Sequence, residues 1–69
     1  MTFANLKTDD LFRTEISYRF CNGNKIEMIK VFKKISKSKA LCIKQIGYDN
    51  TRLVNTINHF YPNSAVYSI

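Results

Sequence analysis

The side chains best suited to chemistry lie near the C-terminal end, and their types match the edges of nucleic-acid bases. Arginine pairs with the two major-groove acceptors of guanine, asparagine with adenine, and threonine with polar edges or the thymine methyl group. Four residues of these types or with a similar polar side chain are spaced i, i+3, i+4 and i+7 along residues 52–59. A helix over residues 51–60 would therefore present them on one face. We therefore predict base contacts by Asn50, Arg52, Asn55, Thr56 and His59. The alternative is a plain packed helix whose polar residues reflect an asparagine-rich composition.

The net charge of the chain is concentrated in one stretch. Eleven Lys and Arg oppose five Asp and Glu, which leaves a net charge of +6. Between Lys25 and Lys44, seven lysines face Glu27 alone, so this stretch carries the whole excess. Such a field attracts a polyanion, although a lysine surface that merely aids solubility is the alternative. We predict phosphate contacts by six of these lysines: Lys30, Lys33, Lys34, Lys37, Lys39 and Lys44.

Nothing in the sequence predicts an enzyme, a metal site or a cofactor. His59 is the only imidazole, and beside two aromatic residues it is interpreted as a surface or edge-of-core side chain. The acids Asp9 and Asp10 are adjacent rather than on one face, which is typical of a polar turn. Cys21 and Cys42 lack the C-x-x-C spacing of a zinc or redox site, and whether they pair stays open. We expect no catalytic residue.

Length and composition predict one small domain over residues 1–69, with residues 1–10 as a flexible arm. The composition is that of a folded protein, with 45% hydrophobic residues, two Gly and one Pro. No apolar run approaches the roughly 18–20 residues that cross a membrane. The first residues also lack the order of a signal peptide. We therefore expect a cytoplasmic protein without membrane contact.

Residues 12–20 carry the clearest pattern, an alternation of apolar and polar side chains. Phe12, Tyr18 and Phe20 share the apolar phase, and every second residue is polar. This period of two predicts a strand with one face on the core. The same aromatic residues would also suit a platform on which nucleic-acid bases stack, but burial in the core is favoured.

Residues 25–35 allow two readings. Asn22-Gly23 is a strong hairpin signal, but a two-residue turn would place Phe20 opposite Lys25 on the expected core face. As a helix, the segment begins at the N-cap Asn24 and lines up its apolar residues on one face. We predict the helix. The strand reading leads to an alternative β-β-β-α-β sheet with one helix.

The remaining segments predict two more helices and a strand. Residues 39–46 form a short helix that ends at Gly47, and residues 51–60 form a third helix that stops before Pro62. Residues 64–69 form a short strand that pairs with residues 12–20. The expected fold class is α+β: a small three-helix domain with one antiparallel strand pair.

This order of elements resembles the helix-turn-helix and winged-helix class of DNA-binding domains over residues 39–60. The resemblance rests on the segment from Ile43 to Gly47, the turn at residues 48–50 and the segment from Thr51 to Ile57. The class prefers a small residue where this chain has Ile43. The resemblance implies that residues 51–60 are a recognition helix in the major groove of double-stranded DNA. A protein of 69 residues has a small interface with DNA, so specific binding suggests a homodimer or a partner protein.

Two functions follow as expectations. The first is a small DNA-binding regulator of transcription, of phage or mobile-element type. The alternative is a non-enzymatic inhibitor or adaptor, also of phage or mobile-element type, whose basic face docks on an acidic protein surface.

Overall fold

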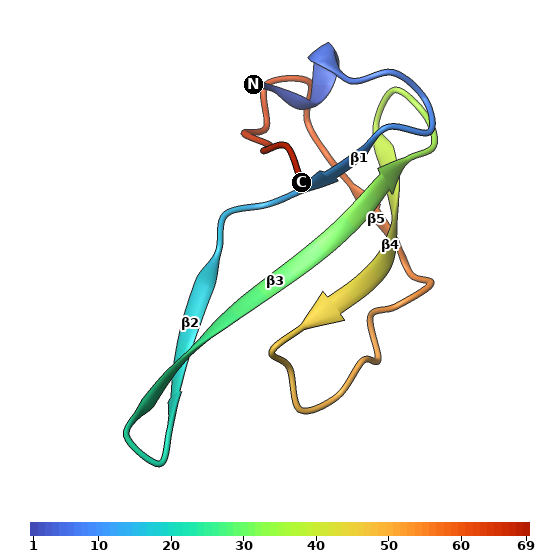
Figure 1. Cartoon of the computed structure of the whole chain (residues 1–69). Helices are drawn as coiled ribbons and strands as arrows, with labels where there is room; N and C mark the ends of the chain where they lie inside the picture. The colour runs from blue at the N-terminus through green and yellow to red at the C-terminus, as the bar shows by residue number, and fades with distance from the viewer.

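One long strand organises the structure, a computed structural model that describes all 69 residues (Figure 1). This strand, β3, spans Asn24–Lys34 and pairs with three other strands. In chain order the elements are a 3-10 turn η1 (Phe3–Asn5) and strands β1 (Leu11–Arg13), β2 (Ser17–Cys21), β3, β4 (Lys39–Ile46) and β5 (Ile57–His59).

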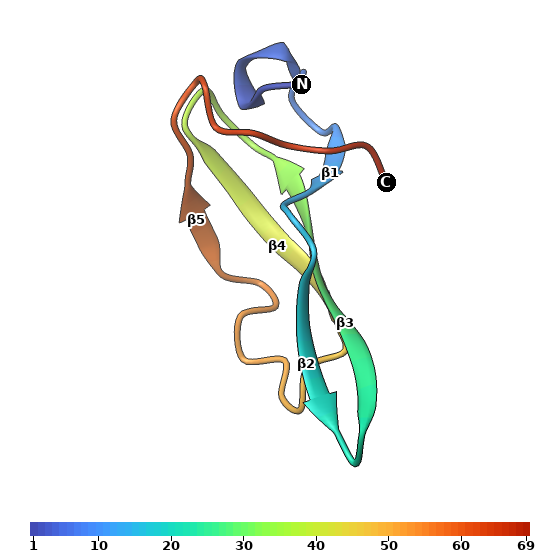
Figure 2. The ribbon, with the colours of Figure 1, turned by 90° about the vertical axis from the view of Figure 1, so that its left-hand side faces the viewer.

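The sheet is antiparallel throughout, with the order β1-β3-β4-β5. Strands β1 and β4 both pair with residues 31–33 of β3, so they lie on its opposite edges. Strand β2 pairs with the first half of β3, over residues 24–28. The β2–β3 hairpin therefore projects beyond the rest of the sheet and gives the molecule an elongated shape of 40 × 23 × 17 Å (Figures 1 and 2).

The helix expected over residues 25–35 is wrong, because residues 25–34 belong to strand β3. Asn22 and Gly23 have φ values of 52° and 80°, the paired positive values of a tight hairpin turn. Phe20 lies opposite Lys25, the register that argued against the hairpin. This register would conflict with burial only if the aromatic face of β2 packed on the core. In the structure this face is exposed, so aromatic and charged side chains share it without conflict.

The single strand expected over residues 12–20 is two strands, β1 and β2, separated by residues 14–16. The break shifts the register on β3 by one residue, since Arg13 pairs with Val31 but Ser17 pairs with Met28. A shift of one residue reverses the face to which every side chain points. Phe12 therefore packs into the core, whereas the aromatic side chains of β2 lie on the other face.

The other two expected helices are also absent. Residues 39–46 form β4, and residues 51–60 form turns followed by β5. Leu53 and Ile57 of this segment are exposed. Residues 64–69 form no strand and make two isolated bridges, Ala65 to Thr2 and Tyr67 to Arg13.

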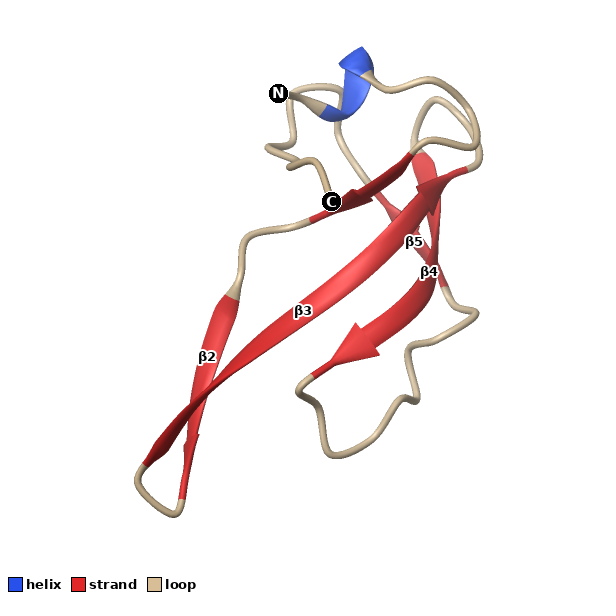
Figure 3. Ribbon diagram, in the orientation of Figure 1, coloured by secondary structure: helices blue, strands red, loops and turns tan.

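Figure 3 shows no α-helix, and one short 3-10 turn is the only helical element. The three-helix fold and its one-helix alternative are therefore both wrong, and the helix-turn-helix resemblance fails with them. The protein is a small five-stranded antiparallel sheet.

The core is small and built around phenylalanine. Phe3, Phe12, Phe32 and Phe60 contact one another with ring centroids 5.0–5.7 Å apart, in stacked and edge-on pairs. Such pairs add to the stability that burial of their area provides. Only eight of 69 residues are buried, so the free energy of unfolding rests on few side chains.

A candidate binding face on the sheet

The side of the sheet that faces away from the phenylalanine core forms a continuous surface, which we call the outer face. Paired residues share a face, and their strand neighbours point the other way. Phe12, Phe32 and Cys42 pair in register on the core side. The outer face therefore comprises Leu11, Arg13, Val31, Lys33, Lys39, Leu41, Lys44, Ile57 and His59.

The outer face is ordered in cross-strand rows. One row runs across four strands through Leu11, Lys33, Leu41 and Ile57. A second row joins Arg13, Val31 and Lys44, and a third joins Lys39 and His59. Basic and aliphatic side chains are thus mixed over this face, and Val31 is buried between its two cationic neighbours.

A β-bulge in β4 brings Lys44 onto this face. Cys42 pairs with Phe32, and Lys44 pairs with Val31, the next residue along β3. Ile43 is therefore an extra residue in β4. An extra residue reverses the alternation of the strand beyond it. Without the bulge, Lys44 would point toward the core side and the outer face would lose one of its cations.

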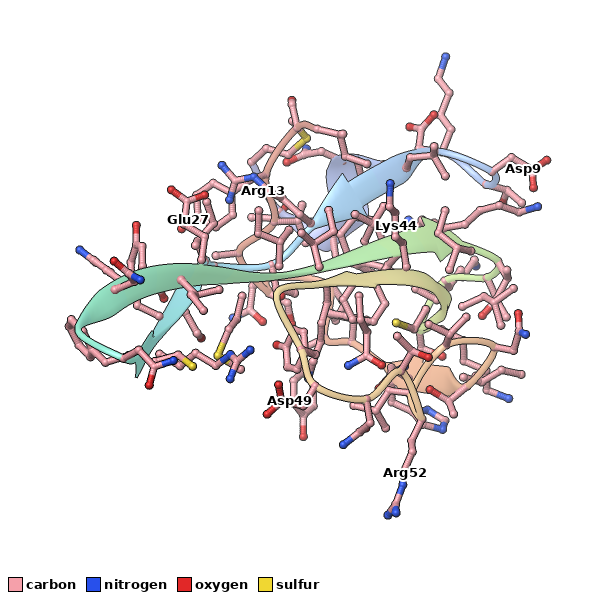
Figure 4. All side chains as sticks on the ribbon, turned by 60° about the horizontal axis from the view of Figure 1, so that its bottom comes forward. Asp9, Arg13, Glu27, Lys44, Asp49 and Arg52 are labelled. Carbon is pink, nitrogen blue, oxygen red and sulfur yellow. The ribbon has the colours of Figure 1, made fainter.

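The outer face has a positive excess. Arg13, Lys33, Lys39 and Lys44 supply the cations, and Lys39 and Lys44 are exposed. Asp9 lies 3.7 Å from the Nζ of Lys33 and neutralises part of that charge. Figure 4 shows Arg13 and Lys44 projecting from the same side of the ribbon. The guanidinium of Arg13 lies 4.9 Å from the ring centroid of Tyr67, a cation–π contact that orients it.

The six lysines predicted to contact phosphate do not share one surface. Lys33, Lys39 and Lys44 lie on the outer face, and Lys37 is exposed in the turn between β3 and β4.

The other two predicted lysines point to the core side. The Nζ of Lys30 lies 5.8 Å from the ring centroid of Tyr48. Lys34 is buried, and its Nζ donates hydrogen bonds to the carbonyl oxygens of Phe3 (3.0 Å) and Leu6 (2.7 Å). Lys34 therefore fixes the N-terminal segment to the sheet.

Sequence reasoning missed Arg13 as a member of the charged surface. Its signal was present, because Arg13 alternates with the buried Phe12 and must point away from the core. The lysine count drew attention to residues 25–44 alone.

The residues predicted to contact bases lie in the loop between β4 and β5, except for His59, which is on the outer face. The Asn50 side chain accepts a hydrogen bond from the backbone amide of Arg52 (3.3 Å), and Thr56 Oγ1 donates to the Leu53 carbonyl. Arg52 projects from the side of the ribbon opposite to Lys44 (Figure 4). The structure does not bring the five residues together on one face.

This loop is fastened to the hairpin by Arg19. Its Nε donates to the Gly47 carbonyl (2.8 Å), and its guanidinium forms an ion pair with Asp49 at 3.0 Å. Gly47 has a φ of 80°, and a Cβ there would overlap the carbonyl oxygen of Glu27. A glycine is thus required where the loop crosses β3.

Other kinds of site find little support. Cys21 is exposed and Cys42 is buried, and both are free thiols. No group of three or more His, Cys, Asp or Glu side chains is placed to hold a metal ion. None of the helical structure has the length and apolar character needed to cross a membrane. The chain matches no protein-family model, no curated protein and no solved structure.

Proposed function

We propose that the protein binds nucleic acid through its outer face, with Arg13, Lys33, Lys39 and Lys44 contacting phosphates. The observation that carries the proposal is the convergence of these four cations from three strands onto one side of the sheet. Cations that neutralise phosphates release condensed counterions, and this release supplies sequence-independent affinity. Duplex DNA is the first ligand to test. The homodimer expected from the small interface is part of the same proposal.

The test is fluorescence anisotropy of a labelled random duplex, titrated with protein at low and near-physiological salt. We expect an affinity that falls steeply as salt rises. A Lys39→Ala/Lys44→Ala double variant should flatten the slope of log affinity against log salt by about 1.8, at about 0.9 per phosphate contact. The matched control is Arg52→Ala, which removes an exposed cation from the opposite side of the ribbon. Sedimentation of the complex reports whether two copies bind together.

The chain is strongly basic, so the absence of nucleic-acid binding at low salt would overturn the proposal. A loss of slope of about 0.9 in Arg52→Ala, half that of the double variant, would overturn the assignment to the outer face, since net charge alone would then explain the binding.

A second candidate function is docking on an acidic protein, and one observation favours it. Leu11 and Ile57 are both exposed and lie in the same row as Lys33. Apolar side chains between cations suit an interface that packs as well as attracts. A pull-down with the wild-type protein and the Lys39→Ala/Lys44→Ala variant as paired baits tests this candidate. A partner retained equally by both would contradict it.

A further inference from the structure

The tip of the β2–β3 hairpin exposes two aromatic rings on one face. Phe20 is 75% exposed and Tyr18 is 49% exposed, and neither belongs to the core. They stand two residues apart on β2, so their side chains leave the same face about 7 Å apart. Large apolar side chains that stay exposed to water on a projecting hairpin mark a surface for binding.

The surroundings of the two rings are basic. Lys25 lies opposite Phe20 in the register, and its Nζ is 4.0 Å from the ring centroid of Tyr18. One acid, Glu27, lies opposite Tyr18. Lys25 therefore covers one face of the Tyr18 ring and leaves the other face for a stacked base, with a cation beside it.

The aromatic face continues into the outer face of the sheet. The residues paired with Tyr18 and Phe20 are Glu27 and Lys25, which share the phase of Val31 and Lys33 along β3. Figure 4 shows Glu27 on the same side of the ribbon as Arg13 and Lys44. One ligand can therefore follow β3 from the hairpin tip to the basic rows.

We propose that Phe20 and Tyr18 are a stacking platform for unpaired bases, so that the preferred ligand is single-stranded nucleic acid. This inference rests on the proposed function and names its ligand class. In a duplex the flat faces of the bases are covered by their neighbours, and exposed aromatic rings have nothing to stack on. The ring spacing of about 7 Å is twice the 3.4 Å rise of stacked bases, so it suits an extended strand.

The charge of the chain argues for this ligand over an uncharged one. A single strand offers bases to the rings and phosphates to Lys25 and the outer-face cations, which matches the alternation of aromatic and basic groups. Deoxyribose and ribose strands share this chemistry. The test therefore includes both an oligothymidine and an oligouridine, together with a duplex of the same length.

Affinity is measured by anisotropy for wild type, Phe20→Ala and Tyr18→Ala. The matched control is Tyr61→Ala, because Tyr61 is 78% exposed but lies outside the β2–β3 hairpin. We expect Phe20→Ala and Tyr18→Ala each to bind the single strands at least about fivefold more weakly than wild type does. Duplex affinity and the Tyr61→Ala variant should stay within about twofold of wild type. Rescue by Phe20→Tyr is expected, since it restores a ring of similar area.

A spectroscopic readout separates stacking from simple loss of apolar surface. The chain has no Trp, so Phe20→Trp introduces a unique fluorophore at the tip. Its emission should be quenched when the single strand binds, whereas Trp at the control position in Tyr61→Trp should be unchanged.

The outcomes separate this inference from the proposed function. If Lys39→Ala/Lys44→Ala weakens binding but Phe20→Ala does not, the platform is wrong and the basic face stands. Tighter binding of the duplex than of both single strands, or unquenched Trp in Phe20→Trp, also overturns the platform. If no nucleic acid binds at low salt, both proposals fall together.

Discussion

Two adjacent lysines, Lys33 and Lys34, have opposite roles in the structure, and substituting each separates binding from stability. Lys33 lies on the outer face, where the proposed function has it contact phosphate. Lys34 points to the core side and is buried. We consider Lys33→Ala, which removes the cation, and Lys34→Met, which keeps the apolar stem but removes the ammonium group.

The stability cost of Lys34→Met follows from two hydrogen bonds. The Nζ donates to the carbonyl oxygens of Phe3 and Leu6, and it lies 4.5 Å from the Phe3 ring centroid. Each hydrogen bond from a charged donor contributes about 1.5–3 kcal/mol. Relief of the buried charge offsets part of this loss, so we expect a net cost of about 2 kcal/mol. A domain of this size has a total stability of about 3–5 kcal/mol.

A loss of that size is large in a thermal unfolding curve. At about 4–8 °C per kcal/mol, Lys34→Met should lower the Tm by about 8–16 °C. Lys33→Ala removes only the exposed pair with Asp9, which contributes at most about 1 kcal/mol. It should lower the Tm by less than Lys34→Met does and reduce the salt slope of duplex binding by about 0.9.

The assay pairs far-UV circular dichroism melting with anisotropy at several salt concentrations, below the Tm of both variants. The result that refutes the reasoning is a Lys33→Ala protein with the larger loss of Tm, or a Lys34→Met protein with the larger loss of slope. Either would mean that the two side chains are assigned to the wrong faces of β3.

The remaining predictions concern the backbone and the loop between β4 and β5. Gly47→Ala should unfold the protein or lower its stability by well over about 2 kcal/mol, because a left-handed φ costs about 1–2 kcal/mol and the new Cβ would overlap the Glu27 carbonyl. Gly23→Ala has the same φ of 80° but open space around it, so denaturant titration should show only the cost of the φ; equal losses would contradict the packing argument. Arg19→Ala should release the loop and accelerate limited proteolysis within residues 47–56, and an unchanged cleavage rate would show that the Arg19 contacts do not hold the loop in place.

Local signals in the sequence located the hairpin but did not decide in its favour. Asn22-Gly23 marked the turn, and the register that it implies is the one observed. The helix was preferred because apolar residues of this segment recur at helical spacing. In the structure, Ile26 and Val31 lie on opposite faces of β3, and Ile26 is half-buried and Val31 buried. A strand that carries such apolar residues on both faces loses the alternation that identifies it.

The charge of the candidate site was predictable, but its membership was not. Which lysines share a face depends on the strand phase of β3 and on the bulge at Ile43, and neither leaves a mark in the sequence. The bulge places Lys44 on the same face as Lys39, and the alternation of side chains along β3 places Lys33 and Lys34 on opposite faces. The predicted base-contact set failed to converge for a simpler reason, because residues 51–56 form turns instead of a helix.

The exposed rings of the hairpin show where the core argument failed. The sequence favours burial of Tyr18 and Phe20 over a stacking platform, because a strand with one apolar face is expected to bury that face. That expectation holds where another layer covers the strand, as at Phe12. The break at residues 14–16 turns the apolar phase of β2 to the other face, beyond the reach of the phenylalanine cluster. The aromatic side chains that do not pack in the core are exposed on the β2–β3 hairpin, where a ligand can reach them. Substitution of Phe20 should therefore affect binding and leave the Tm unchanged.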